Sequence, residues 1–349
     1  MNTEENNFSN LGVVEDPRTD EQKAKDWSND ELAGAVMLVW QKKQRKDWKT
    51  YTKRNQSSSS SCVAQSTAKG MEIIDQFIAD ANKVYSAHPI YRSRVNFPEG
   101  GMYLANAGDI AKKQGTTLES LDPSQNLGET AMNRPIEVET PDKIFGYIAT
   151  VNPKKGIDAI AEVIETHGHC ILIVHCDRDE YLREKPKYDP KGIIDIGHAV
   201  CGVDYFIDEE GDKVILIEDS AGLYSTIDGN GQRLITEDFL LKRFDGAMYL
   251  IPKTGPSDDE KPQHTFSRAL TFGMKGDKDV IALQDILKYE GIFPLTIPST
   301  GNYLNVTAKA VLEFQKKYSI GTAEELARLG GRNVGPKTRA KLNDLYGEK

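Results

Sequence analysis

Four side chains in this chain have the types and the order of a site for nucleophilic acyl transfer. Cys62 supplies a thiol, His198 and Asp219 follow it with an imidazole and a carboxylate, and Gln56 precedes it with a side-chain amide. An imidazole can take the proton of a thiol, a carboxylate can orient that imidazole, and an amide N–H can stabilise an oxyanion. The four residues therefore predict covalent catalysis by Cys62 on a carbonyl group.

The segments around these residues predict elements that would bring them together. Serines fill positions 57–61, where they are good helix N-caps, and apolar residues then recur at helical spacing, so Cys62 is expected to open a helix. A helix start and a nearby imidazole both favour the thiolate. Residues 199–206 and 213–217 predict two strands joined by a hairpin loop. Such a hairpin would carry His198 and Asp219 to the same end of a sheet.

Each of these residues has a simpler structural explanation when it is taken alone. A free cysteine is more often buried in a core than reactive. All four roles are filled together here, and this favours catalysis. Residues 167–176 hold two cysteines and three histidines, but no zinc spacing occurs among them. Strand alternation would put the cysteines on one face and His169 and His175 on the other, so we expect buried thiols, no metal and no cofactor.

The pattern resembles the papain-like cysteine peptidases over residues 47–252. The family's histidine motif is similar to segment 197–205, and its Asn-Ser-Trp-Gly motif is similar to segment 218–222. The double glycine of the family's substrate groove is similar to Gly100-Gly101, and Asp47-Trp48 followed by Asn55-Gln56 resembles the start of the mature domain. The resemblance implies an α+β fold with two lobes, one helical and one built on an antiparallel sheet.

The same resemblance assigns roles to the residues. Cys62 would be the nucleophile and His198 the general base and acid, while Asp219 would hold the orienting position that Asn usually takes. Gln56 would donate to the oxyanion beside the backbone N–H of Cys62. The implied activity is that of a cysteine-type endopeptidase on a peptide or protein substrate. The residues implied to line the substrate are Gly100, Gly101, Met102, Tyr103 and Gly197.

Three departures from the family pattern bear on activity. Segment 59–63 lacks the partner cysteine, the glycine and the tryptophan that flank the family's nucleophile. Ala221 replaces the tryptophan that shields the third catalytic residue from water. The N-terminal extension, residues 1–46, is too short for the family's inhibitory pro-segment, so we do not expect autoinhibition by that route. We expect a working but less insulated catalytic site, with an inactive descendant as the alternative.

A second region follows a linker at residues 253–265, which is rich in proline and charge at its start. Within residues 266–349, apolar spacing predicts three helices, near 280–287, 307–318 and 336–346. The Leu-Gln pair at 283–284 and the Ala-Val-x-x-Phe-Gln pattern at 310–315 resemble the peptidoglycan-binding domain of cell-wall hydrolases. The resemblance implies a peptidoglycan partner. The candidate glycan-binding residues are Asn302, Tyr303 and Asn305, because polar and aromatic loop residues suit sugar contact.

Composition and charge narrow the class of protein. The chain has 349 residues, 38% hydrophobic and 28% charged, with a net charge of −9, so it is globular and no nucleic-acid partner is expected. No apolar run reaches the length of a membrane span, and the longest one, 32–40, follows an acidic lead rather than a secretory signal. The four cysteines lack the disulfide framework of secreted relatives, so we expect synthesis in the cytoplasm. Action at the cell envelope or carriage in a phage particle remains compatible with this.

Three functions fit the sequence. The first is a cysteine endopeptidase with a Cys-His-Asp triad, targeted to the bacterial cell wall by its C-terminal region. The second is a catalytically decayed wall-binding or virion structural protein on a papain-like scaffold. The third is an intracellular peptidase whose terminal region binds a protein partner. Retention of all four catalytic residue types favours the first.

Overall fold

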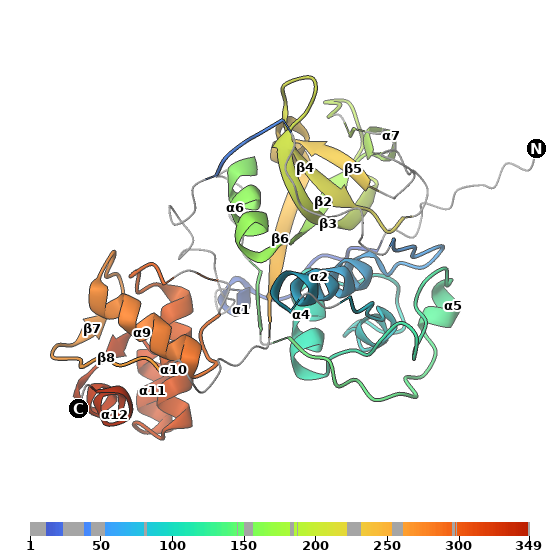
Figure 1. The fold of residues 1–349 in the computed structure, drawn as a ribbon. Helices are drawn as coiled ribbons and strands as arrows, with labels where there is room; N and C mark the ends of the chain where they lie inside the picture. Colours follow the sequence, from blue (N-terminus) through green and yellow to red (C-terminus); the bar gives the residue numbers. More distant parts are fainter. Residues whose placement is uncertain are drawn as a thin grey trace, which may run out of the picture. The chain divides into compact units, whose positions relative to one another are not determined.

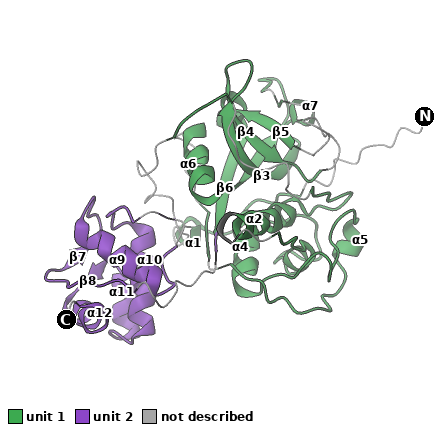
Figure 2. Ribbon diagram, in the orientation of Figure 1, with its two compact units in different colours: residues 1–23, 38–250 green, residues 24–37, 251–349 purple. Residues whose placement is uncertain are grey.

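The computed structural model describes residues 12–23, 38–42, 53–79, 82–144, 146–149, 156–181, 185–186, 188–221, 232–252, 261–294, 297 and 299–347. Asp47-Trp48, Gly222, most of the N-terminal extension and most of the linker lie outside these residues. The chain divides into two compact units, one from residues 1–23 and 38–250, the other from 24–37 and 251–349 (Figure 2). No helix among the described residues has the length and apolar character to cross a bilayer.

The first unit combines short helices with one long buried helix, α2. Apart from its last three residues, whose side chains are not described, α2 is almost wholly buried, and it packs on α3, on α4 and on two strands of the sheet. Its buried positions include Val63, Ile73 and Ile74, which belong to the main apolar core. The helices of this part are α1 (Asp20–Lys23), α2 (Cys62–Ala79), α3 (His88–Arg92), α4 (Leu104–Lys113) and α5 (Glu129–Met132).

The rest of the first unit is built on a six-stranded sheet with the strand order β1-β6-β2-β3-β4-β5. The pairs β2–β3, β2–β6, β3–β4 and β4–β5 are antiparallel. Helix α6 packs against β2, β3 and β4 (Figure 1). The strands are β1 (Gly146–Ile148), β2 (Cys170–Cys176), β3 (Ile196–Ile207), β4 (Lys213–Glu218), β5 (Gln232–Thr236) and β6 (Phe244–Ile251), and the helices are α6 (Ile157–His167), α7 (Arg178–Tyr181) and α8 (Glu237–Arg243). This mixed architecture with an antiparallel sheet agrees with the expected α+β fold.

The hairpin of β3 and β4 positions the histidine and the aspartate. The loop closes with Asp208 N–H donating to Asp212 O at 3.0 Å, as the sequence predicted for this segment. The register then pairs Cys201 with Glu218, with an irregularity between Gly202 and Asp204. Because the strands run antiparallel, the residue after β4 returns towards the start of β3. His198 and Asp219 consequently lie at one end of the hairpin.

The second unit has four helices and a two-stranded sheet in its described part. The predicted helices are present as α9 (Lys278–Tyr289), α10 (Asn305–Lys317) and α12 (Pro336–Tyr346). A further helix, α11 (Ala323–Leu329), lies between the second and the third of these and begins with a capping box between Thr322 and Glu325. The strands β7 (Leu270–Thr271) and β8 (Asn333–Val334) form the small sheet. The unit therefore has one helix more than the sequence predicted.

Two buried glutamines reveal an internal repeat in the second unit. Gln284 Nε2 donates to Asn302 O at 3.0 Å and to Thr307 Oγ1 at 2.9 Å. Gln315 Nε2 makes the corresponding bonds, to Asn333 O at 3.1 Å and to Thr338 Oγ1 at 3.0 Å, at the same separations along the chain. Each glutamine ties its helix to the loop and the helix start that follow. These polar residues therefore stabilise the repeat, because buried amide groups need hydrogen-bond partners.

Candidate active site

Cys62 is the first residue of α2, as its sequence context predicted, and its side chain is fully buried. The preceding turn is held by its serines: the Ser59 hydroxyl donates to Gln56 O at 2.6 Å and lies 2.7 Å from the Ser61 hydroxyl. Ser61 O then accepts the N–H of Gln65 in the first turn of the helix. The thiol thus lies at a helix N-terminus, where the helix dipole favours an anion.

His198 and Asp219 are in direct contact. The distance from His198 Nε2 to Asp219 Oδ1 is 2.8 Å, and both side chains are buried. The other ring nitrogen, Nδ1, is buried and has no hydrogen-bond partner among the described residues. Cys62 contributes, together with Asp219, to stabilising the charged form of the ring. Asp219 therefore occupies one ring nitrogen, and the other, Nδ1, is left for another partner.

The charges at the site reinforce each other. Burial lowers the pKa of His198, but the charge and hydrogen bond of Asp219, with a contribution from Cys62, outweigh burial and raise it to about 10. Burial raises the pKa of Asp219, but the His198 charge, its hydrogen bond and the Arg233 charge together hold it below its ordinary value. The site therefore favours an imidazolium beside an ionised carboxylate at neutral pH.

Sequence reasoning missed two residues that contact Asp219. The Tyr181 hydroxyl donates to Asp219 Oδ2 at 2.8 Å, and Arg233 Nη1 donates to the same oxygen at 3.0 Å. No motif links Tyr181 to the other residues. The only signal for Arg233 was a charged residue inside the strand-like segment 232–236, which is weak because a strand has an exposed face in many sheets.

Gln56 lies next to the aspartate through Ser220. Its backbone N–H donates to Ser220 O at 2.8 Å, and its side-chain Oε1 accepts from the Ser220 hydroxyl at 2.7 Å. The amide Nε2 donates to Ser59 O at 2.9 Å. One N–H of the amide is therefore bound within the turn that precedes Cys62, and the two bonds fix the plane of the amide.

The predicted substrate groove is occupied by the chain itself. Val13 N–H donates to Gly197 O and Val14 N–H donates to Met102 O, both at 3.3 Å, while Met102 N–H donates to Gly12 O at 2.8 Å. Gly12 and Val13 form isolated parallel bridges with Gly197 and Met102. The N-terminal extension was expected to be too short for an inhibitory pro-segment, and a few of its residues nevertheless pair through their backbone with both Met102 and Gly197 of the predicted groove.

Glycines permit this close approach of the segment. A Cβ on Gly12 would lie 1.9 Å from Ser60 O, and one on Gly101, whose φ is +78°, would lie 2.7 Å from Gly12 O. Gly100 faces the Ser60 hydroxyl, where a Cβ would be 3.0 Å away. Next to the predicted groove, the Arg18 guanidinium lies 5.7 Å from the centre of the Tyr103 ring. All five residues expected to line the groove therefore lie near residues 12–18 or near Ser60.

The histidines and cysteines of segment 167–176 have structural roles. His169 Nε2 accepts the N–H of Leu250 at 3.1 Å, and burial lowers the pKa of this histidine to about 4. His167 stacks on Tyr249 with ring centres 4.0 Å apart. Cys170 and Cys176 are buried, and burial raises the pKa of both thiols.

Asp208, Glu210 and Asp212 form the one group, among the described residues, whose ligand atoms are close enough together for a metal ion. The Lys185 ammonium contacts all three carboxylates, at 2.5 to 2.9 Å. A cation is therefore already present at the centre of this cluster.

The residues expected to contact glycan are placed differently from that expectation. Tyr303 is fully buried and its hydroxyl donates to Gly331 O at 2.6 Å, so its ring packs in the core of the second unit and offers no surface to a sugar. Asn302 Oδ1 accepts the N–H of Gly276 at 3.1 Å, and its carbonyl accepts from Gln284. Asn305 is the first residue of α10. The aromatic member of the set is thus excluded as a sugar contact.

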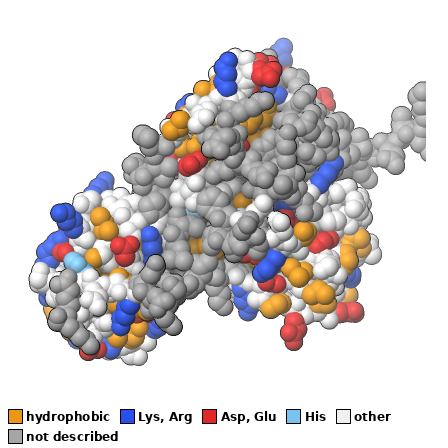
Figure 3. All heavy atoms as spheres, viewed as in Figure 1, with side chains coloured by type: hydrophobic (Ala, Val, Ile, Leu, Met, Phe, Trp, Pro, Cys, Tyr) orange, Lys and Arg blue, Asp and Glu red, His pale blue; other side chains and the backbone are white. Residues whose placement is uncertain are grey.

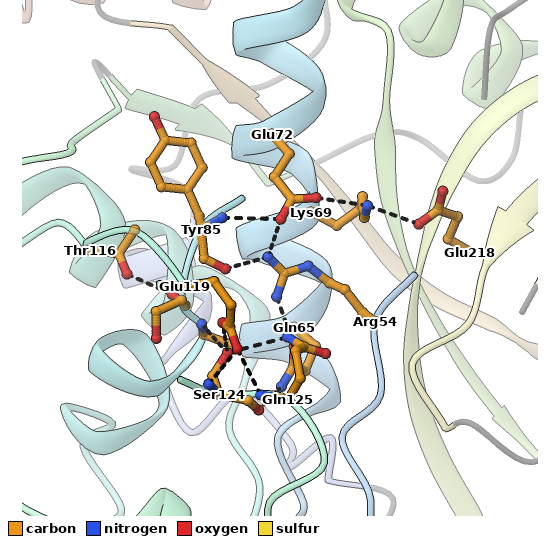
Figure 4. Close-up of polar contacts among 12 residues, drawn as sticks. Arg54, Gln65, Lys69, Glu72, Tyr85, Thr116, Glu119, Ser124, Gln125 and Glu218 are labelled. Carbon is orange, nitrogen blue, oxygen red and sulfur yellow. Dashed lines mark hydrogen bonds and ion pairs between the residues drawn. The ribbon is translucent and has the colours of Figure 1, made fainter. Parts of the chain in front are cut away.

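A second ionic cluster, made of Arg54, Lys69, Glu72 and Glu218, lies along α2 (Figure 4). Lys69 Nζ is 2.7 Å from Glu72 Oε2 and 3.2 Å from Glu218 Oε2, so it joins α2 to the end of β4. Arg54 contacts the other oxygen of Glu72 and the carbonyl of Tyr85. Burial raises the pKa of Glu218 although Lys69 opposes this. The cluster connects α2 with the strand that precedes Asp219.

Comparisons with known proteins bear on the fold. No family model and no curated protein sequence matches the chain. Among solved structures, xylellain, a cysteine protease from Xylella fastidiosa, is similar over 70% of this chain and 96% of its own, with a TM-score of 0.53 and 16% identity. The procathepsin B S9 from Trypanosoma congolense is similar over 71% and 88%, with a TM-score of 0.54 and 12% identity. The chain has a papain-like fold. At these identities the likeness concerns the architecture, an antiparallel sheet beside a helical region, and not the chemistry.

Proposed function

We propose that this papain-like chain is a cysteine-type endopeptidase, with Cys62 as nucleophile, His198 as general base and acid, and Asp219 as the orienting carboxylate. The observation that carries the proposal is the contact of His198 Nε2 with Asp219 at 2.8 Å while Nδ1 stays available to Cys62 at a helix start. A histidine whose far nitrogen is fixed by a carboxylate presents its near nitrogen in a defined tautomer and orientation.

The proposed reaction has two halves. The Cys62 thiolate attacks the carbonyl carbon of a peptide bond, and the backbone N–H of Cys62 with the Gln56 amide stabilise the oxyanion. The His198 imidazolium gives its proton to the leaving amine, and an acyl-enzyme remains. His198 then takes a proton from water, which attacks the thioester and releases the acid. The first half uses the proton of the imidazolium and the second half restores it from water, so the thiolate–imidazolium pair is regenerated and water is the only further reactant.

The test is covalent labelling of Cys62 by a thiol-reactive epoxide in the full chain. We expect labelling at Cys62 alone, abolished in Cys62→Ala and strongly slowed in His198→Ala. Because residues 12–14 cover the groove, the same measurement is made with Gly12→Ala, which adds a Cβ where Ser60 O lies 1.9 Å away. Labelling that is indifferent to His198 in both backgrounds would contradict the proposal.

That contradictory outcome would favour the second candidate, a decayed peptidase used as a scaffold. Two observations support this candidate. Cys62 is fully buried under the present arrangement, and Ala221 offers only a methyl group beside Asp219. The labelling experiment separates the two functions, because a scaffold has no need of an activated thiol.

We further propose that the second unit directs the peptidase to the peptidoglycan of a bacterial envelope or of a phage's host. The support is the resemblance of its sequence patterns, while Asn302 and Asn305 remain candidates for sugar contact. Lys and Arg side chains are scattered over the visible face of this unit, with acidic ones between them, and do not gather in one patch (Figure 3). Cosedimentation of the full chain with purified sacculi tests the idea, and failure to sediment would favour a protein partner for this unit.

A further inference from the structure

Asp219 is more heavily bonded than an orienting carboxylate requires. Its Oδ1 accepts from His198 Nε2 at 2.8 Å and from the Ala221 N–H at 2.9 Å. Its Oδ2 accepts from the Tyr181 hydroxyl at 2.8 Å and from Arg233 Nη1 at 3.0 Å. Orientation of the imidazole uses only the first of these bonds. The two hydrogen bonds to Oδ2 therefore need an explanation other than orientation of the imidazole.

Arg233 is a buried charge that is matched to this carboxylate. It lies on β5, opposite Ile217 of β4, and only 1% of its side chain is exposed. Its Nη2 contacts the carbonyl of Tyr181, which holds the end of α7 against the guanidinium. A buried arginine is tolerated where an anion compensates it. Among the described residues, Asp219 is the carboxylate that forms an ion pair with Arg233.

Tyr181 joins the guanidinium to the imidazole. The Arg233 guanidinium lies 4.3 Å from the centre of the Tyr181 ring. The Tyr181 and His198 rings are T-shaped, with their centres 5.4 Å apart and their planes at 76°. The tyrosine is 1% exposed, and burial together with the Asp219 charge raises the pKa of its hydroxyl, so it remains a donor. The ring thus excludes water from the contact between His198 and Asp219.

An ionised carboxylate alone would impair the thiol chemistry. A negative charge near Cys62 opposes formation of a second anion on its sulfur, because water is excluded and charges interact strongly there. The Arg233 guanidinium, bonded to the far oxygen of the carboxylate, offsets that negative charge. The imidazole keeps its direct hydrogen bond, which His198 Nε2 donates to Asp219 Oδ1. Paired with Arg233, the carboxylate can orient His198 without repelling the thiolate.

We propose that Arg233 and Tyr181 are positioning residues of the site, in which Arg233 neutralises Asp219 towards Cys62 and Tyr181 shields and aligns His198. The inference rests on the proposed function, and it names the residues that tune it. The charged and titratable groups facing Asp219 are His198 on β3, Arg233 on β5 and Tyr181 on α7. Arg54, Lys69 and Glu218 of the second ionic cluster line a small cavity together with Asp219.

The test is the pH midpoint of thiolate formation by Cys62 in the full chain, followed by ultraviolet absorbance against Cys62→Ala as baseline. Burial raises the pKa of Cys170, Cys176 and Cys201, so these thiols add no thiolate near neutral pH. The readout needs no substrate. The variants are Arg233→Gln, Asp219→Asn, the combination of the two, and Tyr181→Phe.

We expect Arg233→Gln to move the midpoint to higher pH by about one unit, because the carboxylate is then uncompensated. Asp219→Asn should move it to lower pH by a similar amount, since one negative charge is removed while the guanidinium stays in place. The combined variant should return to within a few tenths of a unit of the wild type, because the net charge is restored. Tyr181→Phe should leave the midpoint within about half a unit, but should lower the rate of epoxide labelling about tenfold.

Arg243→Gln is the matched control, because Arg243 is also a buried arginine paired with a buried carboxylate, Glu180, at 2.7 Å. It should cost stability without moving the midpoint. If Arg233→Gln fails to fold, the combined variant and Asp219→Asn still decide the question by their difference. Equal midpoints in all variants would overturn the inference. Absence of labelling in every variant, with midpoints that still shift, would overturn the proposed function and the role of Tyr181, and would leave only the charge compensation by Arg233 standing.

Discussion

Glu218 and Asp219 are neighbours in sequence, are buried to the same degree, with 8% and 7% of each residue exposed, and yet have opposite pKa shifts. Burial raises the pKa of Glu218, against the opposing charge of Lys69. Asp219 is equally desolvated, but the His198 and Arg233 charges and several hydrogen bonds lower its pKa. The difference lies in the donors: Asp219 has two on each oxygen, whereas Glu218 Oε1 has no hydrogen-bond partner among the described residues.

The comparison shows how the fold separates two kinds of buried charge. Successive side chains of a strand point to opposite faces, so adjacent carboxylates enter different surroundings. Asp219 enters the pocket of His198, Tyr181 and Arg233, while Glu218 enters the cluster along α2. A carboxylate with donors on both oxygens keeps its charge more readily, whereas one with an unmatched oxygen binds its proton more tightly.

The largest expected effect comes from removing the fully bonded carboxylate. Asp219→Ala leaves the buried Arg233 without its ion pair, so we expect a loss of about 3–5 kcal/mol in the free energy of unfolding. Epoxide labelling of Cys62 should slow about a thousandfold, because His198 loses its orientation. Urea unfolding and labelling kinetics measure the two losses. Glu218→Gln is the control, and it should change the free energy of unfolding and the labelling rate by much less. Equal losses in both variants would contradict the difference between the two carboxylates.

The next largest effect concerns the lysine of the second cluster. Lys69→Met leaves Glu72 with Arg54 and leaves Glu218 without its cation, so the free energy of unfolding should fall by about 3 kcal/mol. Combining it with Glu218→Gln should recover part of that loss, because the uncompensated carboxylate is then gone. Urea unfolding of the two single variants and the double variant gives the coupling. Simple additivity of the two single effects would show that Lys69 does not act through Glu218.

Glu218 and Asp219 should contribute to the pH dependence of stability with opposite signs. Glu218 binds its proton more tightly in the folded state, so it lowers stability as pH rises from its ordinary pKa of 4.5 through its higher folded value. Asp219 does the reverse, and its stabilisation is lost only as pH falls below its ordinary value of 3.8. Glu218→Gln should therefore raise the free energy of unfolding at neutral pH relative to acidic pH. Unfolding curves that run parallel for both proteins across this range would contradict the assignment.

His198 should add a second change, at alkaline pH, to the same plot of the free energy of unfolding against pH. Its folded pKa of about 10 lies above its ordinary 6.5, so its stabilisation is present below 6.5 and is lost as pH rises through about 10. In Asp219→Asn this alkaline limb should move to lower pH, because the carboxylate that raises the pKa is gone. A limb unchanged by Asp219→Asn would mean that another group titrates there.

The smallest expected effect concerns residues 12–14, which are held by backbone bonds without ion pairs. Gly12→Ala should displace them, because its Cβ would lie 1.9 Å from Ser60 O, and labelling of Cys62 should speed up about tenfold. The free energy of unfolding should change little, since three hydrogen bonds at a surface contribute modestly. Gly211→Ala is the control, since no atom lies within 4 Å of a Cβ there, although its φ of +90° adds local strain. Unchanged labelling in Gly12→Ala would show that the segment does not limit access.

Prediction succeeded where the signal was local. The helix that opens at Cys62, the hairpin of β3 and β4, and the second unit's helices α9, α10 and α12 all follow from caps, alternation and apolar spacing. Prediction from the sequence was incomplete where a feature depends on residues far apart along the chain or on strand register. The helix α11, the buried position of Tyr303 and the occupation of the groove by residues 12–14 had no sequence signature, because burial is set by partners far along the chain.

The sequence by itself determined the chemical types at the site, the helix start beneath the thiol and the strands that carry the imidazole and the carboxylate. Those depend on side-chain chemistry and short-range backbone preferences, which a single segment contains. The tertiary structure alone decided the state of the carboxylate. Tyr181 and Arg233 reach Asp219 from α7 and β5 across the fold, and only their convergence in a region without water turns a strand-end aspartate into a neutralised, fully bonded partner of His198.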